Sequence, residues 1–159
     1  MTPTQTHPAT TIERRSVHRP VAIALTVCFL IVVTFQLALA FGAPFGEAAL
    51  GGANSGRLPG ALRAVTAFQA LVWLALALIV LARGGFAISP VPRRVAYWGT
   101  WAIVGILSLA MVLNVASSSP WERYGWAPFI LIMLALSVVL ARTDADPHRQ
   151  SAAPSAGLA

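Results

Sequence analysis

The residues of this sequence whose chemistry could matter are polar side chains near the ends of long apolar runs. Arg63, Thr66 and Gln69 are spaced i, i+3 and i+6, which places them on roughly one face of a helix. Because an amide left unpaired in hydrocarbon is costly, we expect such groups to turn inward and meet one another. The candidate cluster comprises Gln36, Glu47, Arg63, Thr66, Gln69, Asn114 and Glu122.

Two interpretations of this cluster stay open. In the first, the side chains form ordinary hydrogen bonds between helices, worth roughly 0.6–2 kcal/mol each. In the second, they line a shallow, outward-facing polar pocket in which Glu47 or Glu122 balances the charge of Arg63.

Catalytic chemistry finds little support in these residue types. An enzyme needs a nucleophile, an acid–base pair or a metal, yet no histidine or carboxylate falls in the middle of an apolar run. Glu47 and Glu122 are single acids in different connections. We therefore predict that the protein is not an enzyme and has no catalytic or cofactor-binding residue.

The residues that bind metals are also dispersed. His7, His18 and His148 lie in the polar tails, and the single cysteine, Cys28, lies inside an apolar run. Without a Cys–His or His–carboxylate cluster, the sequence predicts no metal site and no cofactor. Cys28 is interpreted as a small buried hydrophobe.

The composition indicates which solvent surrounds the chain. Charged residues make up 10% of it and apolar residues 57%, whereas a soluble domain carries roughly 25% charge. Most of the surface must therefore face something other than water, and lipid is the simplest candidate. The net charge of +6 comes from arginines in tails, connections and the ends of apolar runs. No basic face with interleaved aromatics appears, so we predict no nucleic-acid partner.

The apolar runs predict the fold. The first has about 21 residues and would span about 31 Å as a helix, enough for the hydrocarbon core. We predict an all-α, polytopic membrane protein with four transmembrane helices in an antiparallel bundle over residues 21–141. The polar segments 1–20 and 142–159 are predicted to be disordered cytoplasmic tails. The predicted spans are about 21–41, 61–82, 95–116 and 120–141.

The first run has a competing interpretation. A basic segment, an apolar run and Ala38-Leu39-Ala40 resemble a signal peptide cleaved after Ala40. The run is longer than the roughly 7–15 residues typical of such a segment, and three more apolar runs follow. We therefore favour a helix that is retained.

The start of the fourth span is also open to two interpretations. Ser119, Pro120 and Glu122 fit a capping box, with Ser119 as the N-cap and Pro120 at the first helical position. A helix could then run from Pro120 to Ala141 and be kinked at Pro128. Alternatively, residues 120–125 form a separate interfacial turn. We favour the kinked helix.

The arginines predict the orientation. Eight lie in the two tails and the second connection, and three lie in the first and third connections or at the adjoining helix entrance. By the positive-inside rule, both tails face the cytoplasm. The aromatic residues agree with this placement. Tyr97, Trp98 and Trp101 would form the inner interfacial belt, and Trp121, Tyr124 and Trp126 the outer one.

The first outer connection is unusually rich in glycine. Residues 42–60 hold six of the twelve glycines, together with Phe45 and Leu50. We expect these apolar side chains to fold the loop back onto the helix ends, although a flexible surface loop remains the alternative. A weak similarity between the two halves, each with an outer-end amide (Gln36, Asn114) and a Pro-aromatic pair, is what two hairpins related by duplication would show, but its spacing differs between the halves and chance could produce it.

The segments PFGEAALGG, GRLPGALR and SSPWERYGWAP, set among four apolar runs, resemble small uncharacterised four-helix integral membrane proteins of high-GC, actinobacterial-type bacteria. The resemblance covers roughly residues 20–141. It implies a multi-pass protein of the bacterial plasma membrane and carries no established activity or functional residues.

The function that follows is an interaction role. We predict a small accessory or scaffold subunit that acts through helix–helix contacts, with the lipid bilayer and a second copy or another membrane protein as partners. The alternative is a component of a small-solute carrier or channel that uses the outward-facing polar cluster.

Overall fold

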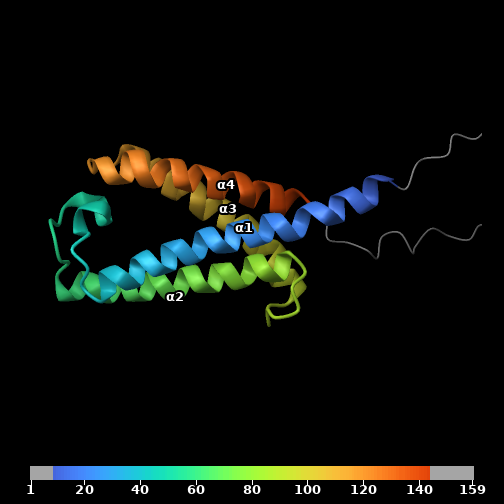
Figure 1. The fold of residues 1–159 in the computed structure, drawn as a ribbon, viewed down its shortest axis with the longest axis horizontal. Coiled ribbons are helices and arrows are strands. Elements are labelled where there is room, and N and C mark those ends of the chain that lie inside the picture. The colour runs from blue at the N-terminus through green and yellow to red at the C-terminus, as the bar shows by residue number, and fades with distance from the viewer. Residues whose placement is uncertain (1–8, 144–159) are drawn as a thin grey trace, which may run out of the picture.

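A computed structural model of the chain describes residues 9–143, with side chains from His18 onward. Within that range the chain is helical and has no strand (Figure 1). Two short 3₁₀ turns, η1 and η2, and one π-helical turn, η3, lie between the long helices. The elements are α1 (Ala9–Ala40), η1 (Gly46–Ala48), η2 (Leu50–Gly52), α2 (Gly60–Arg83), α3 (Arg93–Ala116), η3 (Trp121–Trp126) and α4 (Ala127–Arg142).

Four helical segments are long and apolar enough to cross a membrane, which confirms the prediction of an all-α chain with four candidate spans. Their apolar stretches begin and end close to the predicted bounds because proline or glycine stands at several of the helix ends. Pro59 precedes α2, Pro92 precedes α3, and Gly84 follows α2. The candidate spans are His18–Ala40, Gly60–Arg83, Arg93–Ala116 and Trp121–Arg142.

The largest difference concerns the first helix. From the sequence we predicted that its span begins at Val21 and that residues 1–20 are disordered. In the structure, α1 begins at Ala9. Pro20 lies inside this helix, where it removes one backbone donor without ending the helical run. The remainder of the predicted tails, residues 1–8 and 144–159, lies outside the described residues.

The helices pack as two neighbouring pairs. Figure 1 shows α1 and α2 side by side, and α4 lies on the other side of α1 with α3 behind it. The start of α2 meets the end of α1, where Arg63 Nε donates to the Ala40 carbonyl at 2.8 Å. Further along, the rings of Phe29 and Trp73 lie 5.5 Å apart. The two helices therefore contact each other over much of their length.

Large apolar side chains from all four helices fill the centre of the bundle. Those that are completely buried include Leu25 and Phe29 of α1, Ile103 and Leu107 of α3, and Met133 of α4. Cys28 is half-buried, and it packs beside this core as a small apolar residue would. Burial of each such large side chain contributes about 1.5–3 kcal/mol when the alternative is water.

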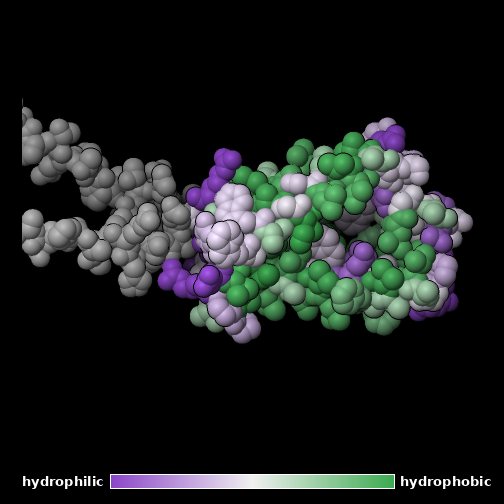
Figure 2. Space-filling view, turned by 180° about the vertical axis from the view of Figure 1, so that it is seen from behind, coloured by the Kyte–Doolittle hydropathy of each residue, from purple (hydrophilic) through white to green (hydrophobic). Residues whose placement is uncertain are grey.

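Much of the outer surface is apolar. Figure 2 shows a broad hydrophobic belt across the middle of one face of the bundle, with most of the hydrophilic residues near its two ends. On α3, Leu109, Val112 and Leu113 are each about 60% exposed. A monomeric soluble protein rarely exposes so much contiguous apolar surface. The belt therefore has the character of a surface that contacts lipid.

Candidate functional site at the loop end of the bundle

The end of the bundle that carries residues 41–59 and 117–126, here called the loop end, has the most polar structure. There the chain is one continuous helical run from Pro120 into α4, not a separate turn. The irregularity is a π-helical turn, in which the Ala127 N–H reaches back to the Glu122 carbonyl. Pro128 follows at the start of the regular helix, where its missing N–H is least costly.

Half of the predicted capping box is present. The Glu122 N–H donates to Ser119 Oγ at 3.4 Å, as an N-cap serine requires. The reciprocal bond is absent, because the Ser119 N–H donates to Ser117 Oγ and the Glu122 carboxylate accepts from the N–H of Gly51 at 2.9 Å. Glu122 is buried, and this hydrogen bond directs its carboxylate to the backbone of the first connection.

Several hydrogen bonds join this part of the chain to the first connection, and we call the set the clasp. On the first connection, every atom that takes part in these hydrogen bonds is a backbone atom. The clasp therefore requires one backbone conformation of that connection. The bonds are Ser119 Oγ to Glu47 O at 2.6 Å, Trp126 Nε1 to Ala48 O at 2.9 Å, Gly51 N to Glu122 Oε1 at 2.9 Å, and Ser118 Oγ to Gly51 O at 3.3 Å.

Glycine is needed where the clasp forms. Gly51 and Gly52 have φ of +79° and +72°, in the left-handed region that other residues avoid. Leu50 also adopts a positive φ, of 53°. A Cβ on Gly52 would lie 2.7 Å from the Cβ of Ser119, so only glycine allows the two segments to approach this closely.

The first connection does fold back onto the helix ends, but not through the side chains expected from the sequence. Ala49 and Leu58 are buried and form a small cluster with Leu39 of α1. Phe45 and Leu50 are 52% and 36% exposed. Phe45 and Leu50 therefore do not hold the loop in place by being buried, although Phe45 lines a cavity beside α1.

A cavity of about 670 Å³ lies beneath the clasp, between α1, the first connection and the start of the fourth span. Half of the residues in its wall are aromatic, and we call it the aromatic pocket. The rings of Phe35 and Trp126 are 4.8 Å apart, and those of Trp126 and Phe129 are 5.8 Å apart. It is lined by Ile31, Phe35, Pro44, Phe45, Glu47, Ala48, Trp121, Gly125, Trp126 and Phe129.

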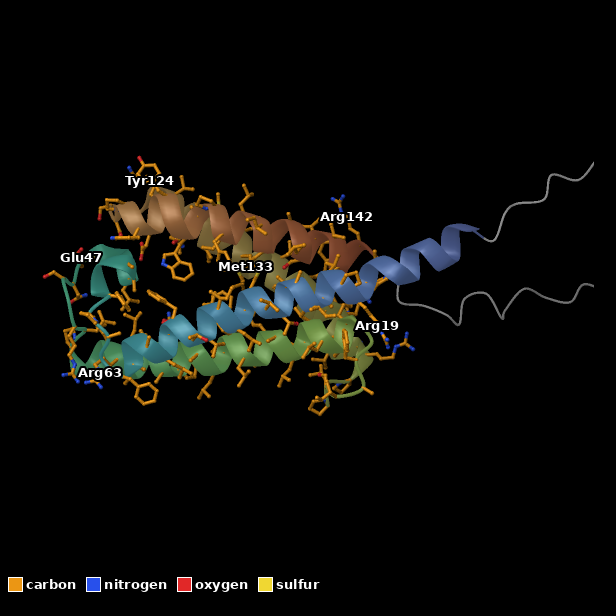
Figure 3. All side chains as sticks on the ribbon, in the orientation of Figure 1. Arg19, Glu47, Arg63, Tyr124, Met133 and Arg142 are labelled. Atoms are coloured by element: carbon orange, nitrogen blue, oxygen red, sulfur yellow. The ribbon has the colours of Figure 1, made fainter. Side chains whose placement is uncertain are left out.

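The polar cluster predicted from the sequence is dispersed. Among residues 18–143, no hydrogen bond or ion pair joins two of the seven candidate side chains. Arg63 binds the Ala40 carbonyl, while the Thr66 hydroxyl and the Asn114 amide donate to carbonyls of their own helices. Figure 3 shows Glu47 at the loop end, with Arg63 at the start of α2.

The remaining candidates differ in their surroundings. Gln36 and Gln69 each have a buried Oε1 atom that accepts no hydrogen bond from a described residue. Glu47 is exposed and lines the aromatic pocket, and Glu122 belongs to the clasp. Glu47 and Glu122 are thus the two candidates that the structure brings to one site, and Arg63 pairs with neither.

The sequence interpretation missed the role of Trp126. We expected this residue in an interfacial belt, but it is only partly exposed, its indole N–H binds the first connection and its ring forms a wall of the pocket. Trp121 and Tyr124 are 63% and 74% exposed, as belt residues would be. No local pattern separates Trp126 from these neighbours, because its partners lie almost eighty residues earlier in the chain.

The fold and composition are those of a multi-pass membrane protein with an aromatic pocket at one end. Among the described residues, no group of three or more His, Cys, Asp or Glu could hold a metal ion. No protein-family model matches the chain, and comparisons with curated proteins and with solved structures also return no match. The resemblance to actinobacterial-type membrane proteins therefore stays a prediction.

Proposed function

We propose that the protein lies in the bacterial plasma membrane as an antiparallel four-helix bundle with both termini in the cytoplasm. In that membrane it binds a small apolar molecule in the aromatic pocket, as the ligand-binding component of a small-solute carrier. The observation that carries this proposal is the 670 Å³ cavity with its aromatic wall. Ligand sites are typically about 300–1,000 Å³ in volume and are mainly apolar.

The position of the pocket supports binding from the outer leaflet. In the proposed orientation its wall is formed by α1 and the fourth span, beside the exposed aromatic residues Trp121 and Tyr124. Such residues gather where headgroups meet hydrocarbon. An apolar molecule dissolved in the membrane would reach the pocket without crossing water, and the clasp would hold the remaining wall in place.

The test uses a matched pair of glycine variants. Gly125 lines the pocket and Gly105 lies in α3, and a Cβ added to either meets no atom within 4 Å. We expect Gly125→Leu to weaken binding of a neutral apolar probe, triphenylmethanol, by at least about tenfold, because the side chain occupies ligand space. Gly105→Leu should bind like the unmodified protein. Equilibrium dialysis against protein-free dodecyl maltoside micelles measures the difference, and equal affinities would contradict the proposal.

The orientation has its own test. In a Cys28→Ser background, a cysteine at Ser55 should react with an impermeant maleimide in intact cells, whereas one at Ala87 should react only after permeabilisation. Both positions are exposed, and the excess of arginine in the second connection supports an inner location for Ala87. Labelling at Ala87 with protection at Ser55 would show the opposite orientation.

A second proposal is the scaffold role, supported by α3. This helix is the least buried of the four candidate spans, and Leu109, Val112 and Leu113 face outward. A partner helix in the membrane could pack on that surface. Lipid would cover the same side chains equally well, so the aromatic pocket carries the first proposal and α3 only the second.

A further inference from the structure

The charge of the aromatic pocket is set by a single residue. Of the side chains that line it, only Glu47 is ionisable. Its carboxylate forms no hydrogen bond or ion pair with any described residue, since the clasp uses only the Glu47 backbone carbonyl. The pocket therefore presents one uncompensated negative charge beside apolar walls.

Among the described residues, none of the nearby arginines forms an ion pair with the Glu47 carboxylate. Arg63 Nε donates to the Ala40 carbonyl, and Arg123 Nη2 donates to the Ser117 carbonyl at 2.6 Å. The Arg57 guanidinium lies against Gly42, close enough that an added Cβ would be 2.5 Å from its Nε atom. Arg63 and Arg123 thus bind carbonyls of residues that do not line the pocket, and Arg57 lies beside Gly42, which does not line it either.

The aromatic wall favours the same sign of ligand charge. Ring faces carry partial negative charge and attract cations, most strongly when the ring is tryptophan. The polar atom of Trp126, its indole N–H, is already bound to Ala48, so the indole offers the ligand its ring. Phe35, Phe45 and Phe129 add further rings and no hydrogen-bond donor.

We propose that the aromatic pocket selects lipophilic monovalent cations, which are organic cations with an aromatic or alkyl body. The positive charge would lie between the Glu47 carboxylate and the ring faces, while the body would fill the apolar cavity. This inference rests on the proposed function, because it names the class of ligand that the same pocket takes.

The experiment compares two probes of nearly identical shape and opposite charge, tetraphenylphosphonium and tetraphenylborate, with the full-length protein in dodecyl maltoside. We expect the phosphonium to bind at least about tenfold more tightly than the borate. Glu47→Gln should reduce phosphonium affinity about tenfold and leave triphenylmethanol affinity unchanged. Because the Glu47 side chain is exposed and unpaired, this variant should elute and melt like the unmodified protein.

A second pair of variants tests the rings. Phe45→Leu, in the pocket wall, should weaken phosphonium binding several-fold, whereas Phe41→Leu, which is 80% exposed and outside the wall, should not. Saturable triphenylmethanol binding that Gly125→Leu blocks, without preference for the phosphonium or without an effect of Glu47→Gln, would overturn the cation inference and retain the proposed function. Absence of saturable binding by every probe would overturn both.

Discussion

Replacement of Arg83 by glutamine is expected to lower the free energy of unfolding by about 2–4 kcal/mol. Arg83 lies at the end of α2 and is 8% exposed. Its Nη2 atom donates to the carbonyls of Ala141 and Thr143, at 3.2 and 2.6 Å, and its guanidinium lies 5.1 Å from the Tyr97 ring centroid. Hydrogen bonds from charged groups contribute about 1.5–3 kcal/mol, and a cation–π contact about 0.5–2 kcal/mol.

The loss is large because the carbonyls of Ala141 and Thr143 lie at the C-terminal end of α4. Backbone carbonyls at a helix C-terminus have no hydrogen-bond donor within the helix. Arg83→Lys should lose less, since it keeps the charge but not the fork of donors. Arg142→Gln is the matched control, because Arg142 is an exposed arginine at the same end, and it should change stability by no more than about 0.5 kcal/mol. Unfolding in detergent, followed by circular dichroism, measures all three. Equal losses for Arg83 and Arg142 would contradict this role.

The second large effect is expected at the clasp. Gly52→Ala should lower the free energy of unfolding by about 2–3 kcal/mol, because the new methyl group faces two penalties. A left-handed backbone costs alanine about 1 kcal/mol. The Cβ would also lie 2.7 Å from the Ser119 Cβ and 3.2 Å from the Glu47 carbonyl oxygen. The two segments must separate, which weakens one or more clasp hydrogen bonds at about 0.5–1.5 kcal/mol each.

Gly56→Ala separates the two penalties. Gly56 has the same φ of +72°, but an added Cβ meets nothing within 4 Å. It should therefore lose only the backbone part, about 1 kcal/mol. Thermal unfolding of both variants beside the unmodified protein gives the difference, which reports the clasp alone. If the two variants unfold alike, the loops are not held together as described.

The helices themselves could be predicted from the sequence because their causes are local. A run of apolar residues long enough for a bilayer, bounded by Pro59, Gly84, Pro92 or Pro120, leaves few alternatives to a helix in lipid. The candidate spans from α2 onward start and stop within two residues of the predicted positions. Only the start of α1 differed, because Pro20 is tolerated within the helix.

The partners of the polar side chains could not be predicted this way. Ser119 and Glu122 fit a local capping box, and the serine does cap its helix, but the carboxylate binds Gly51 instead. Arg63 could be matched to either glutamate by charge alone, yet it binds the Ala40 carbonyl. In each case the partner is a backbone atom, which carries no signature in the sequence.

The pocket was decided by tertiary structure alone. Its walls come from α1, the first connection and the start of the fourth span, segments separated by up to about a hundred residues. Periodicity places Phe35, Phe45 and Trp126 on apolar elements, but it does not state which helix ends meet. That depends on how α1 packs against α4 and on the clasp between two loops, both of which are long-range contacts.

The sequence alone determined that this chain has four apolar helices. The length of each apolar run and the prolines and glycine that bound it are local properties of the sequence. The aromatic pocket exists only because packing brought distant segments together.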